Sequence, residues 1–163
     1  MGPFPIFTFD KSVSLERWYI VDDVVMGGRS AGSLRINDEG IGVFSGTVSL
    51  ENNGGFSSVR YVPDFDTEKA ISQFVLRIKG DGKKYQFRAK SSRYNRHSYI
   101  AEFETNGEWQ TIVLDSDDMY PAFRGRKLRM SNYDGNQLAE VAFLIGNKKP
   151  ESFELQIESI SVR

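Results

Sequence analysis

The side chains that most often carry catalysis are scarce in this chain. Among its 163 residues there is one histidine, His97, and no cysteine. A Ser-His-Asp triad would therefore depend on His97, yet the sequence has no Gly-x-Ser-x-Gly segment to present a serine nucleophile. Zinc sites usually need several His or Cys ligands. We predict that the protein is not an enzyme and has no catalytic residue.

Paired carboxylates are the next possible source of chemistry. Asp22 and Asp23 are consecutive, so in an extended strand they point to opposite faces and do not converge on a substrate. Glu102 and Glu104 share one face of a strand, but a solvated row of charges beside a turn explains them more simply. Neither pair predicts a hydrolytic site.

Three further acids stand close together at residues 115, 117 and 118. Their spacing is not that of a helical calcium loop, so we interpret them as a solvated turn, with an irregular hard-cation site as the alternative. The segment 27–32 is rich in glycine but lacks both phosphate-loop patterns. We predict neither a metal nor a cofactor.

Two glycine-rich segments, 18–30 and 44–60, combine backbone freedom with polar side chains. Each contains a Gly-Gly pair beside acidic or amide residues, and glycine lets backbone groups approach a neighbour closely. Two interpretations stay open. The segments are either binding corners or two demanding turns whose Asp and Asn side chains satisfy their own backbone.

Charge is segregated along the chain although 21 basic and 22 acidic residues give a net charge of -1. The stretch 83–101 has basic residues and no acid, and the stretch 102–123 has acids and no base. We expect the two stretches to pair as antiparallel strands with opposite charges facing each other. The alternative is a basic, aromatic face for an acidic partner or single-stranded nucleic acid, but a pI near 5.9 argues against nucleic acid.

The elements that must position these residues are strands. Short runs of β-branched and aromatic residues alternate with Gly, Asn and Asp, which predicts an all-β sandwich in a single domain over residues 1–163. We expect strands at 4–9, 18–21, 33–36, 43–50, 56–62, 74–79, 85–90, 98–104, 109–114, 141–145 and 153–162. An extra strand around 127–130 would interrupt the irregular stretch 116–138. Asn106-Gly107 predicts a tight hairpin, and 80–82 and 37–40 predict similar turns.

The chain has no run of about 18 apolar residues and no basic, apolar N-terminal signal. We therefore expect a protein that does not span a membrane. The expected location is cytoplasmic.

Several motifs together carry a resemblance to a known family. The first is Trp18 followed by Asp22-Asp23-x-x-Met26-Gly27-Gly28-x-Ser30; the second is Phe44-x-Gly46 followed by Asn52-Asn53-Gly54-Gly55-Phe56-x-Ser58-x-Arg60. Shorter matches are Gly80-Asp81-Gly82-x-x-Tyr85-x-Phe87-Arg88, Trp109, Phe123-Arg124-Gly125-Arg126 and Phe153-x-Leu155-x-Ile157-x-x-Ile160. In these motifs the chain resembles the complex I intermediate-associated protein 30 family.

The resemblance implies a jelly-roll β-sandwich similar to galactose-binding domains. It also implies a non-catalytic, protein-binding factor for the assembly of respiratory complex I (NADH:ubiquinone oxidoreductase), with complex I subunits or assembly intermediates as partners. The short chain without a transit peptide looks like a prokaryotic relative. If the source is eukaryotic and a transit peptide was removed, the resemblance implies the mitochondrial matrix as the location. The expected contact residues are Asp22, Asp23, Met26, Arg29, Ser30, Asn52, Asn53, Phe56, Ser58, Arg60, Arg88 and Arg124.

The alternative function is that of a carbohydrate-binding module with a galactose-binding-like fold. Similar sandwiches bind sugars through exposed aromatic and amide side chains, and Tyr94, Tyr120 and Tyr133 are the candidates for stacking on a sugar ring. An enzyme that uses a flavin or a nucleotide is the least supported possibility.

Overall fold

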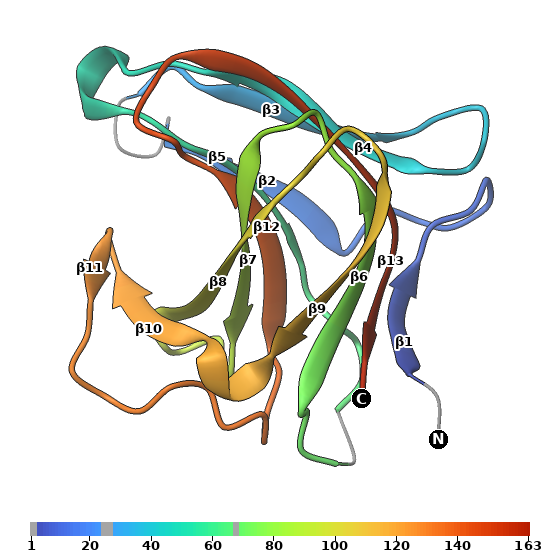
Figure 1. Ribbon diagram of the computed structural model, residues 1–163, viewed down its shortest axis with the longest axis vertical. Coiled ribbons are helices and arrows are strands. Elements are labelled where there is room, and N and C mark those ends of the chain that lie inside the picture. The colour runs from blue at the N-terminus through green and yellow to red at the C-terminus, as the bar shows by residue number, and fades with distance from the viewer. Residues whose placement is uncertain (1–2, 24–27, 67–68) are drawn as a thin grey trace.

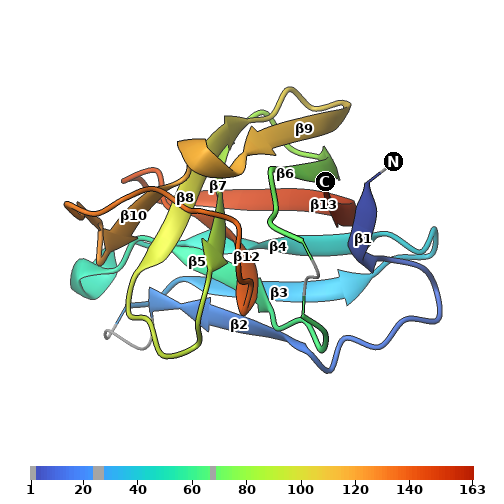
Figure 2. The same cartoon turned by 90° about the horizontal axis from the view of Figure 1, so that it is seen from below.

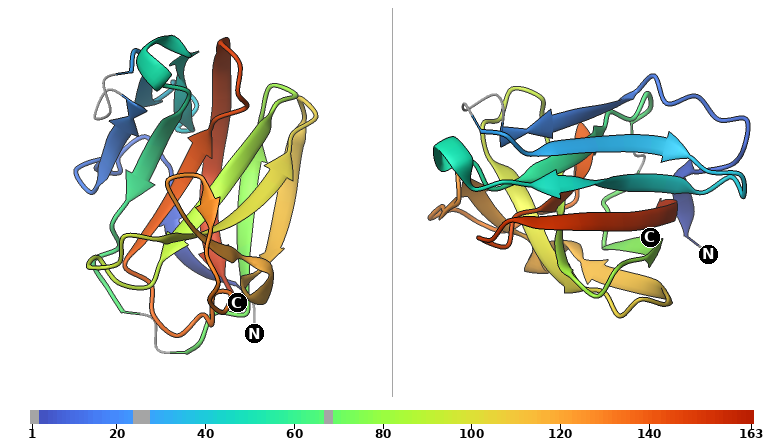
Figure 3. Two further views of the ribbon diagram at one scale, coloured as in Figure 1. Left: turned by 90° about the vertical axis from the view of Figure 1, so that its left-hand side faces the viewer. Right: turned by 90° about the horizontal axis from the view of Figure 1, so that it is seen from above.

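The computed structural model describes residues 3–23, 28–66 and 69–163. Within them the strands form two antiparallel sheets packed against each other (Figures 1 and 3). The prediction of an all-β sandwich is confirmed. In the described part of the chain no helix is long and apolar enough to cross a membrane.

One sheet has six strands in the order β3-β4-β13-β6-β9, with β1 also paired to β13. These strands are β1 (Phe4–Thr8), β3 (Ala31–Ile36), β4 (Gly42–Val48), β6 (Gln73–Lys79), β9 (Trp109–Asp115) and β13 (Glu151–Val162). The long β13 pairs along its first half with β4 and along its last residues with β1, while β6 lies on its other side. Strand β13 is therefore the central strand of this sheet and pairs with three other strands.

The other sheet has seven strands in the order β11-β10-β8-β7-β12-β5-β2. They are β2 (Trp18–Asp22), β5 (Ser57–Tyr61), β7 (Lys84–Lys90), β8 (Ser98–Glu104), β10 (Tyr120–Phe123), β11 (Arg126–Lys127) and β12 (Glu140–Ile145). In the described residues, the 3₁₀ turns η2 (Glu51–Asn53) and η3 (Ser116–Asp118) lie in connections between strands.

Alternation along the strands decides which face of each sheet is buried. In β6, Phe74 and Leu76 are fully buried, and in β7 the same holds for Tyr85 and Phe87. The rings of Phe74 and Phe87 meet across the two sheets with their centroids 4.9 Å apart. Burying each such ring stabilises the fold by roughly 1.5–3 kcal/mol. Gln86 and Arg88, which alternate with the buried residues of β7, consequently lie on the outer face of the seven-stranded sheet.

The predicted hairpin at Asn106-Gly107 is wrong. The turn joins β8, which belongs to the seven-stranded sheet, to β9, which belongs to the six-stranded sheet. Gly107 does have a positive φ of 83°, so the local conformation is as expected, but the chain crosses between the sheets instead of folding back on one. Residues 80–82 also cross, from β6 to β7. Only the 37–40 turn, between the paired strands β3 and β4, is a hairpin among these three.

The irregular stretch 116–138 contains two short strands, β10 and β11, which pair with each other. The expected strand around 127–130 is therefore shorter and earlier, at Arg126–Lys127. The stretch also supplies part of the core. Tyr133 is buried, its ring stacks on Phe74, and its hydroxyl donates to the carbonyl oxygen of Gln137 at 2.6 Å. Tyr133 is thus a core residue and not an exposed platform for a sugar.

Candidate functional site

The two glycine-rich segments meet in one hydrogen-bonded corner, with Asp23 at its centre. Its side chain is buried. The carboxylate accepts hydrogen bonds from the backbone N–H of Ser30 at 2.8 Å, of Gly55 at 2.6 Å and of Phe56 at 3.3 Å, and from the Ser30 hydroxyl. Burial alone would raise the pKa of Asp23, but these donors outweigh it and hold the pKa below its ordinary value.

Asp22 joins neighbouring strands on the other side of the same corner. Its carboxylate accepts from the backbone N–H of Gly32 at 2.8 Å and from the Ser57 hydroxyl at 2.5 Å. Ser58, fully buried, donates to the carbonyl oxygen of Val21 at 2.5 Å. The polar side chains of the corner therefore connect β2 to β3 and β5.

Two glycines are required at this corner because of close packing. A Cβ atom placed on Gly28 would lie 2.4 Å from the Asp23 carboxyl carbon, and one on Gly54 would lie 2.4 Å from its Oδ2. Both distances are far inside van der Waals contact. The interpretation of the corner as demanding turns that satisfy their own backbone accounts for the contacts of Asp22, Asp23, Ser30 and Phe56. Their role in binding a partner stays a prediction.

Other predicted contact residues near the corner are more exposed. Arg29 forms an ion pair with Glu51, Nε to Oε2 at 3.4 Å, with both side chains largely in solvent. Asn52 is exposed in η2 at a positive φ of 56°, a conformation that asparagine tolerates well. Met26 and the side chain of Asn53 lie outside the part of the chain that is described.

Arg124 lies in a different place, the two-residue turn between β10 and β11. Arg124 and Gly125 both have positive φ, 50° and 78°, as a type I′ hairpin turn requires. The guanidinium of Arg124 packs over the ring of Phe123, with 5.2 Å from its carbon to the ring centroid. The turn therefore uses Arg124 for its own geometry and leaves the side chain exposed.

The outer face of the seven-stranded sheet carries a row of side chains that crosses six strands. The pairing registers place one residue from each strand opposite the next: Tyr19, Arg60, Ala142, Arg88, Ile100 and Tyr120, which we call the transverse row. Figure 2 labels the six strands β2, β5, β12, β7, β8 and β10 that contribute to it. A tyrosine stands at each end, and the two arginines flank a small alanine at the middle.

On the β2 side of the row, a carboxylate lies next to Arg60. Glu140 Oε2 is 3.7 Å from Nη1 of Arg60, and the Tyr19 hydroxyl donates to Oε1 of Glu140. Burial, and then the bond to Glu140, raise the pKa of Tyr19 to about 12. Tyr19 therefore stays a neutral hydrogen-bond donor over the physiological pH range.

On the β8 side of the row, a lysine and a carboxylate form an ion pair. Lys84 Nζ lies 2.5 Å from Oε2 of Glu102, and the Tyr120 hydroxyl donates to Oε1 of Glu102 at 3.2 Å. The expectation that the basic and acidic stretches pair as antiparallel strands is confirmed at this point, since β7 and β8 are neighbours. Arg88 is the exception, because it stands opposite the apolar Ile100.

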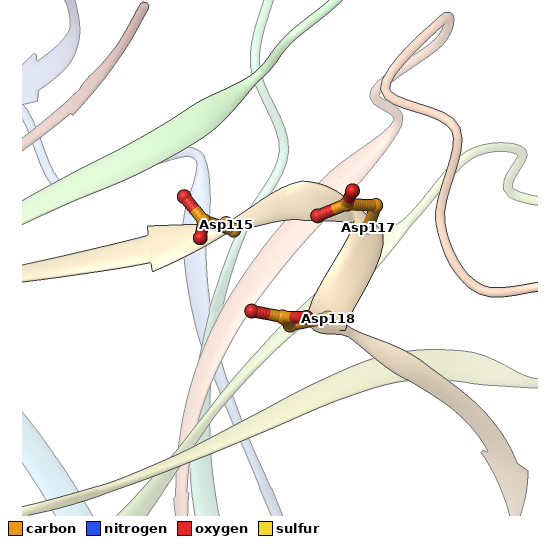
Figure 4. A group of neighbouring side chains, drawn as sticks. All are labelled: Asp115, Asp117 and Asp118. Atoms are coloured by element: carbon orange, nitrogen blue, oxygen red, sulfur yellow. The ribbon is translucent and has the colours of Figure 1, made fainter.

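A groove of about 320 Å³ begins at the Tyr120 end of the row. It is lined by Ile100, Ala101, Glu102, Val113, Leu114, Asp115, Asp118 and Tyr120. Figure 4 shows Asp115 at the end of β9 and Asp117 and Asp118 on η3. One carboxylate oxygen of each lies within 4.8 Å of the others. All three are exposed, and Asp115 also accepts from Gln73 Nε2 at 2.7 Å. This geometry fits a solvated turn as well as a weak cation site.

The structure brings the predicted site residues together in two places and leaves others, such as Arg124, apart from both. Asp22, Asp23 and Ser30 belong to the buried corner, whereas Arg60 and Arg88 share the transverse row. Sequence reasoning missed Glu140 and Gln86 and did not place Tyr19 in a site. Only the pairing register of the sheet brings these residues next to the arginines, and local sequence patterns do not determine that register. The row offers guanidinium and phenol groups, and the neighbouring side chains of Glu140 and Gln86 add a carboxylate and an amide to the same face. This set is suited to non-covalent recognition.

Comparison with known sequences identifies one family. The sequence profile described as complex I intermediate-associated protein 30 matches residues 7–157, most of the chain. No curated protein matches the chain in sequence.

Comparison with solved structures finds the same fold in carbohydrate-binding modules. A family 11 module of the cellulase Lic26A-Cel5E of Clostridium thermocellum has a TM-score of 0.69 and 14% identity, covering 99% of this chain and 94% of its own. Another structure of a family 11 module from that organism, in complex with a beta-1,3-1,4-mixed-linked tetrasaccharide, has a TM-score of 0.67 and 15% identity. The match covers 95% of this chain and 93% of that module. A variant of a family 29 module has a TM-score of 0.63 and 10% identity, and the match covers 100% of this chain and 92% of that module. At these identities the likeness establishes the fold, and it confirms the predicted sandwich class.

Proposed function

Because the chain belongs to the complex I intermediate-associated protein 30 family, we propose that it is a non-catalytic, protein-binding domain that assists the assembly of respiratory complex I. We place its contact surface on the outer face of the seven-stranded sheet. The observation that carries this placement is the transverse row, which brings two arginines and two tyrosines from four strands onto one face.

The composition of this face suits a protein partner. Arginine and tyrosine are the residue types that most often dominate binding energy at protein interfaces. Glu140 beside Arg60 and Glu102 beside Lys84 give the face alternating charges, which select a complementary partner more than they attract any single polyion. Five strand spacings make the row about 24 Å long, comparable with the width of a patch of about 800 Å².

The test is genetic complementation in the native host. Deleting the gene should lower the amount of fully assembled complex I, measured on native gels and by NADH:ubiquinone oxidoreductase activity. The wild-type gene should restore it, and a gene encoding Arg60→Ala with Arg88→Ala should not. The matched control is Arg35→Ala, an exposed arginine of β3 in the other sheet, which should restore assembly fully.

Two outcomes would contradict the proposal. Unchanged complex I in the deletion strain would remove the assembly role. Full rescue by the double variant, at normal protein level, would remove the transverse row as the contact surface.

A second candidate function is carbohydrate binding, and the observation that favours it is the tyrosine at each end of the row. Tyr19 is 42% exposed, and Tyr120 is partly exposed at the mouth of the groove. Phenol rings with polar neighbours are suited to stacking on sugars while hydrogen-bonding hydroxyl groups. The shared sandwich fold is compatible with this function but does not by itself imply it.

A glycan array probed with the purified chain tests this second candidate. Carbohydrate binding predicts signals that disappear in Tyr19→Ala and Tyr120→Ala variants. The signals should persist in Tyr94→Ala, because Tyr94 is 81% exposed but lies outside the row. An array without signal above background would exclude the idea for the glycans present.

A further inference from the structure

Arg88 is a half-buried arginine on the outer face of the seven-stranded sheet, and it has no ion pair in the described part of the chain. Its Nε and Nη2 both donate to one oxygen, Oε1 of Gln86, at 2.9 and 2.8 Å. Over residues 3–23, 28–66 and 69–163, the ion pairs involve other cations, and no carboxylate lies within 4.0 Å of Arg88. A partly buried arginine usually has such a partner, because withdrawing a charge from water is costly.

A second cation adds to this cost. Arg60 and Arg88 both stand opposite Ala142, from the strands on its two sides. Two strand spacings separate their backbones by about 10 Å, and Ala142 places only a methyl group between them. Burial, and then the positive charge of Arg60, lower the pKa of Arg88 to about 10. The group still carries its charge at pH 7, so the repulsion between the arginines persists.

A carboxylate placed over Ala142 would relieve both effects at once. It would give Arg88 the planar, two-oxygen partner that a guanidinium fits best, and it would offset the repulsion from Arg60. Gln86 already fixes the orientation of Arg88 through two hydrogen bonds, so little side-chain entropy remains to be lost on binding.

The surrounding charges limit what can bring that carboxylate. Glu140 contacts Arg60 on one side of the two arginines. On the other side, Glu102 of β8 stands opposite Gln86 of β7. A ligand with a carboxylate on every unit, such as a polyuronate, would meet both acids and be repelled. A single acidic side chain on a protein surface would place one carboxylate between the two arginines and no further carboxylate next to Glu140 or Glu102.

We propose that Arg60 and Arg88 form a subsite over Ala142 for one aspartate or glutamate side chain of the protein partner. This inference rests on the proposed function for the kind of partner, and on the geometry of the row for the carboxylate.

The test follows the arginine Nε–H signals of the purified chain by NMR during titration with small probes. N-acetyl-glutamate amide should shift the signals of Arg88 and Arg60, while the isosteric N-acetyl-glutamine amide should not. D-glucuronate and D-glucose are titrated in the same way, as a charged sugar and a neutral sugar. Arg88→Gln should weaken glutamate binding about tenfold or more, because it removes a charge-assisted hydrogen-bond pair. Arg35→Gln should leave it unchanged.

Near-UV circular dichroism checks that each variant is folded. A further variant, Arg88→Lys, keeps the positive charge but loses the planar guanidinium, and it should bind the glutamate probe more weakly than wild type does. Equal shifts with the glutamate and glutamine probes, or equal shifts at all exposed arginines, would overturn the subsite. Binding of glucuronate without binding of the glutamate probe would overturn a protein carboxylate as its ligand. If the purified chain binds the glutamate probe but deletion of its gene leaves complex I intact, the subsite is supported and only the assembly role is contradicted.

Discussion

Asp23 shows how one buried charge can hold two distant segments of the sequence together. Its carboxylate accepts from Ser30 on one segment and from Gly55 and Phe56 on the other. In an Asp23→Asn variant the side-chain NH₂ group would face N–H groups that now donate to the carboxylate. We therefore expect a loss of about 2–4 kcal/mol in the free energy of unfolding. Urea denaturation measures it. Asp38→Asn, exposed in the β3–β4 turn, should change it by less than about 0.5 kcal/mol.

The same residue gives a pH dependence with a definite sign. The hydrogen bonds to Asp23 hold its folded pKa below the ordinary value of 3.8. Its contribution to stability is therefore complete above the ordinary pKa and is lost as the pH falls through the lower, folded pKa. We expect the stability difference between wild type and Asp23→Asn to be constant near neutral pH and to shrink below about pH 4. A difference that grows on acidification would contradict the inferred direction of the shift.

At the scale of strands, close approach of two backbones decides which glycines are essential. Gly46 stands opposite Gly32 in the β3–β4 pair, and a Cβ atom there would lie 1.9 Å from the carbonyl oxygen of Ala31. A backbone oxygen cannot move aside without disrupting the strand pairing. We expect Gly46→Ala to cost about 3 kcal/mol or more and to lower Tm by about 6–12 °C, measured by circular dichroism.

Gly107→Ala is the matched comparison. Gly107 has a positive φ, but nothing lies within 4 Å of an added Cβ. The cost should be only the backbone strain of about 1–2 kcal/mol. Equal losses at both positions would show that conformation, and not close packing, determines the requirement for glycine.

The strands also show how far the sequence alone could lead. Alternation predicts β7 and β13 because every second side chain is apolar, and the corresponding residues are buried. The Asn106-Gly107 turn was misjudged because its residues determine a local backbone conformation and not the sheet that the chain enters next. Strands β10 and β11 are too short, with 4 and 2 residues, to produce a clear alternating pattern.

The transverse row could not be predicted for a related reason. Its residues come from six strands scattered between positions 19 and 142, and they become neighbours only through the pairing order of the whole sheet. Sequence motifs did identify Arg60 and Arg88. Glu140, the partner of Arg60, lay in no motif, so its contribution appears only once β12 is placed between β5 and β7.

At the scale of the whole molecule, the two sheets share one core, so they should lose stability together. Phe87 on β7 contacts Phe74 on β6 across the sandwich, with ring centroids 4.9 Å apart. We expect Phe87→Leu to cost about 1–2 kcal/mol, which is roughly a fivefold to thirtyfold rise in the unfolded fraction. The slowest-exchanging amides of β6 and β12 should then exchange faster by the same factor, measured by hydrogen exchange and NMR.

Glu158→Gln, an exposed change on β13, should leave the exchange of both strands within about twofold. If Phe87→Leu accelerated exchange in β12 but not in β6, the sheets would be separate cooperative units. A partner docked on the outer face would then stabilise only the seven-stranded sheet. With one shared unit, binding to the transverse row stabilises the six-stranded sheet equally, because any ligand that prefers the folded state shifts the single unfolding equilibrium.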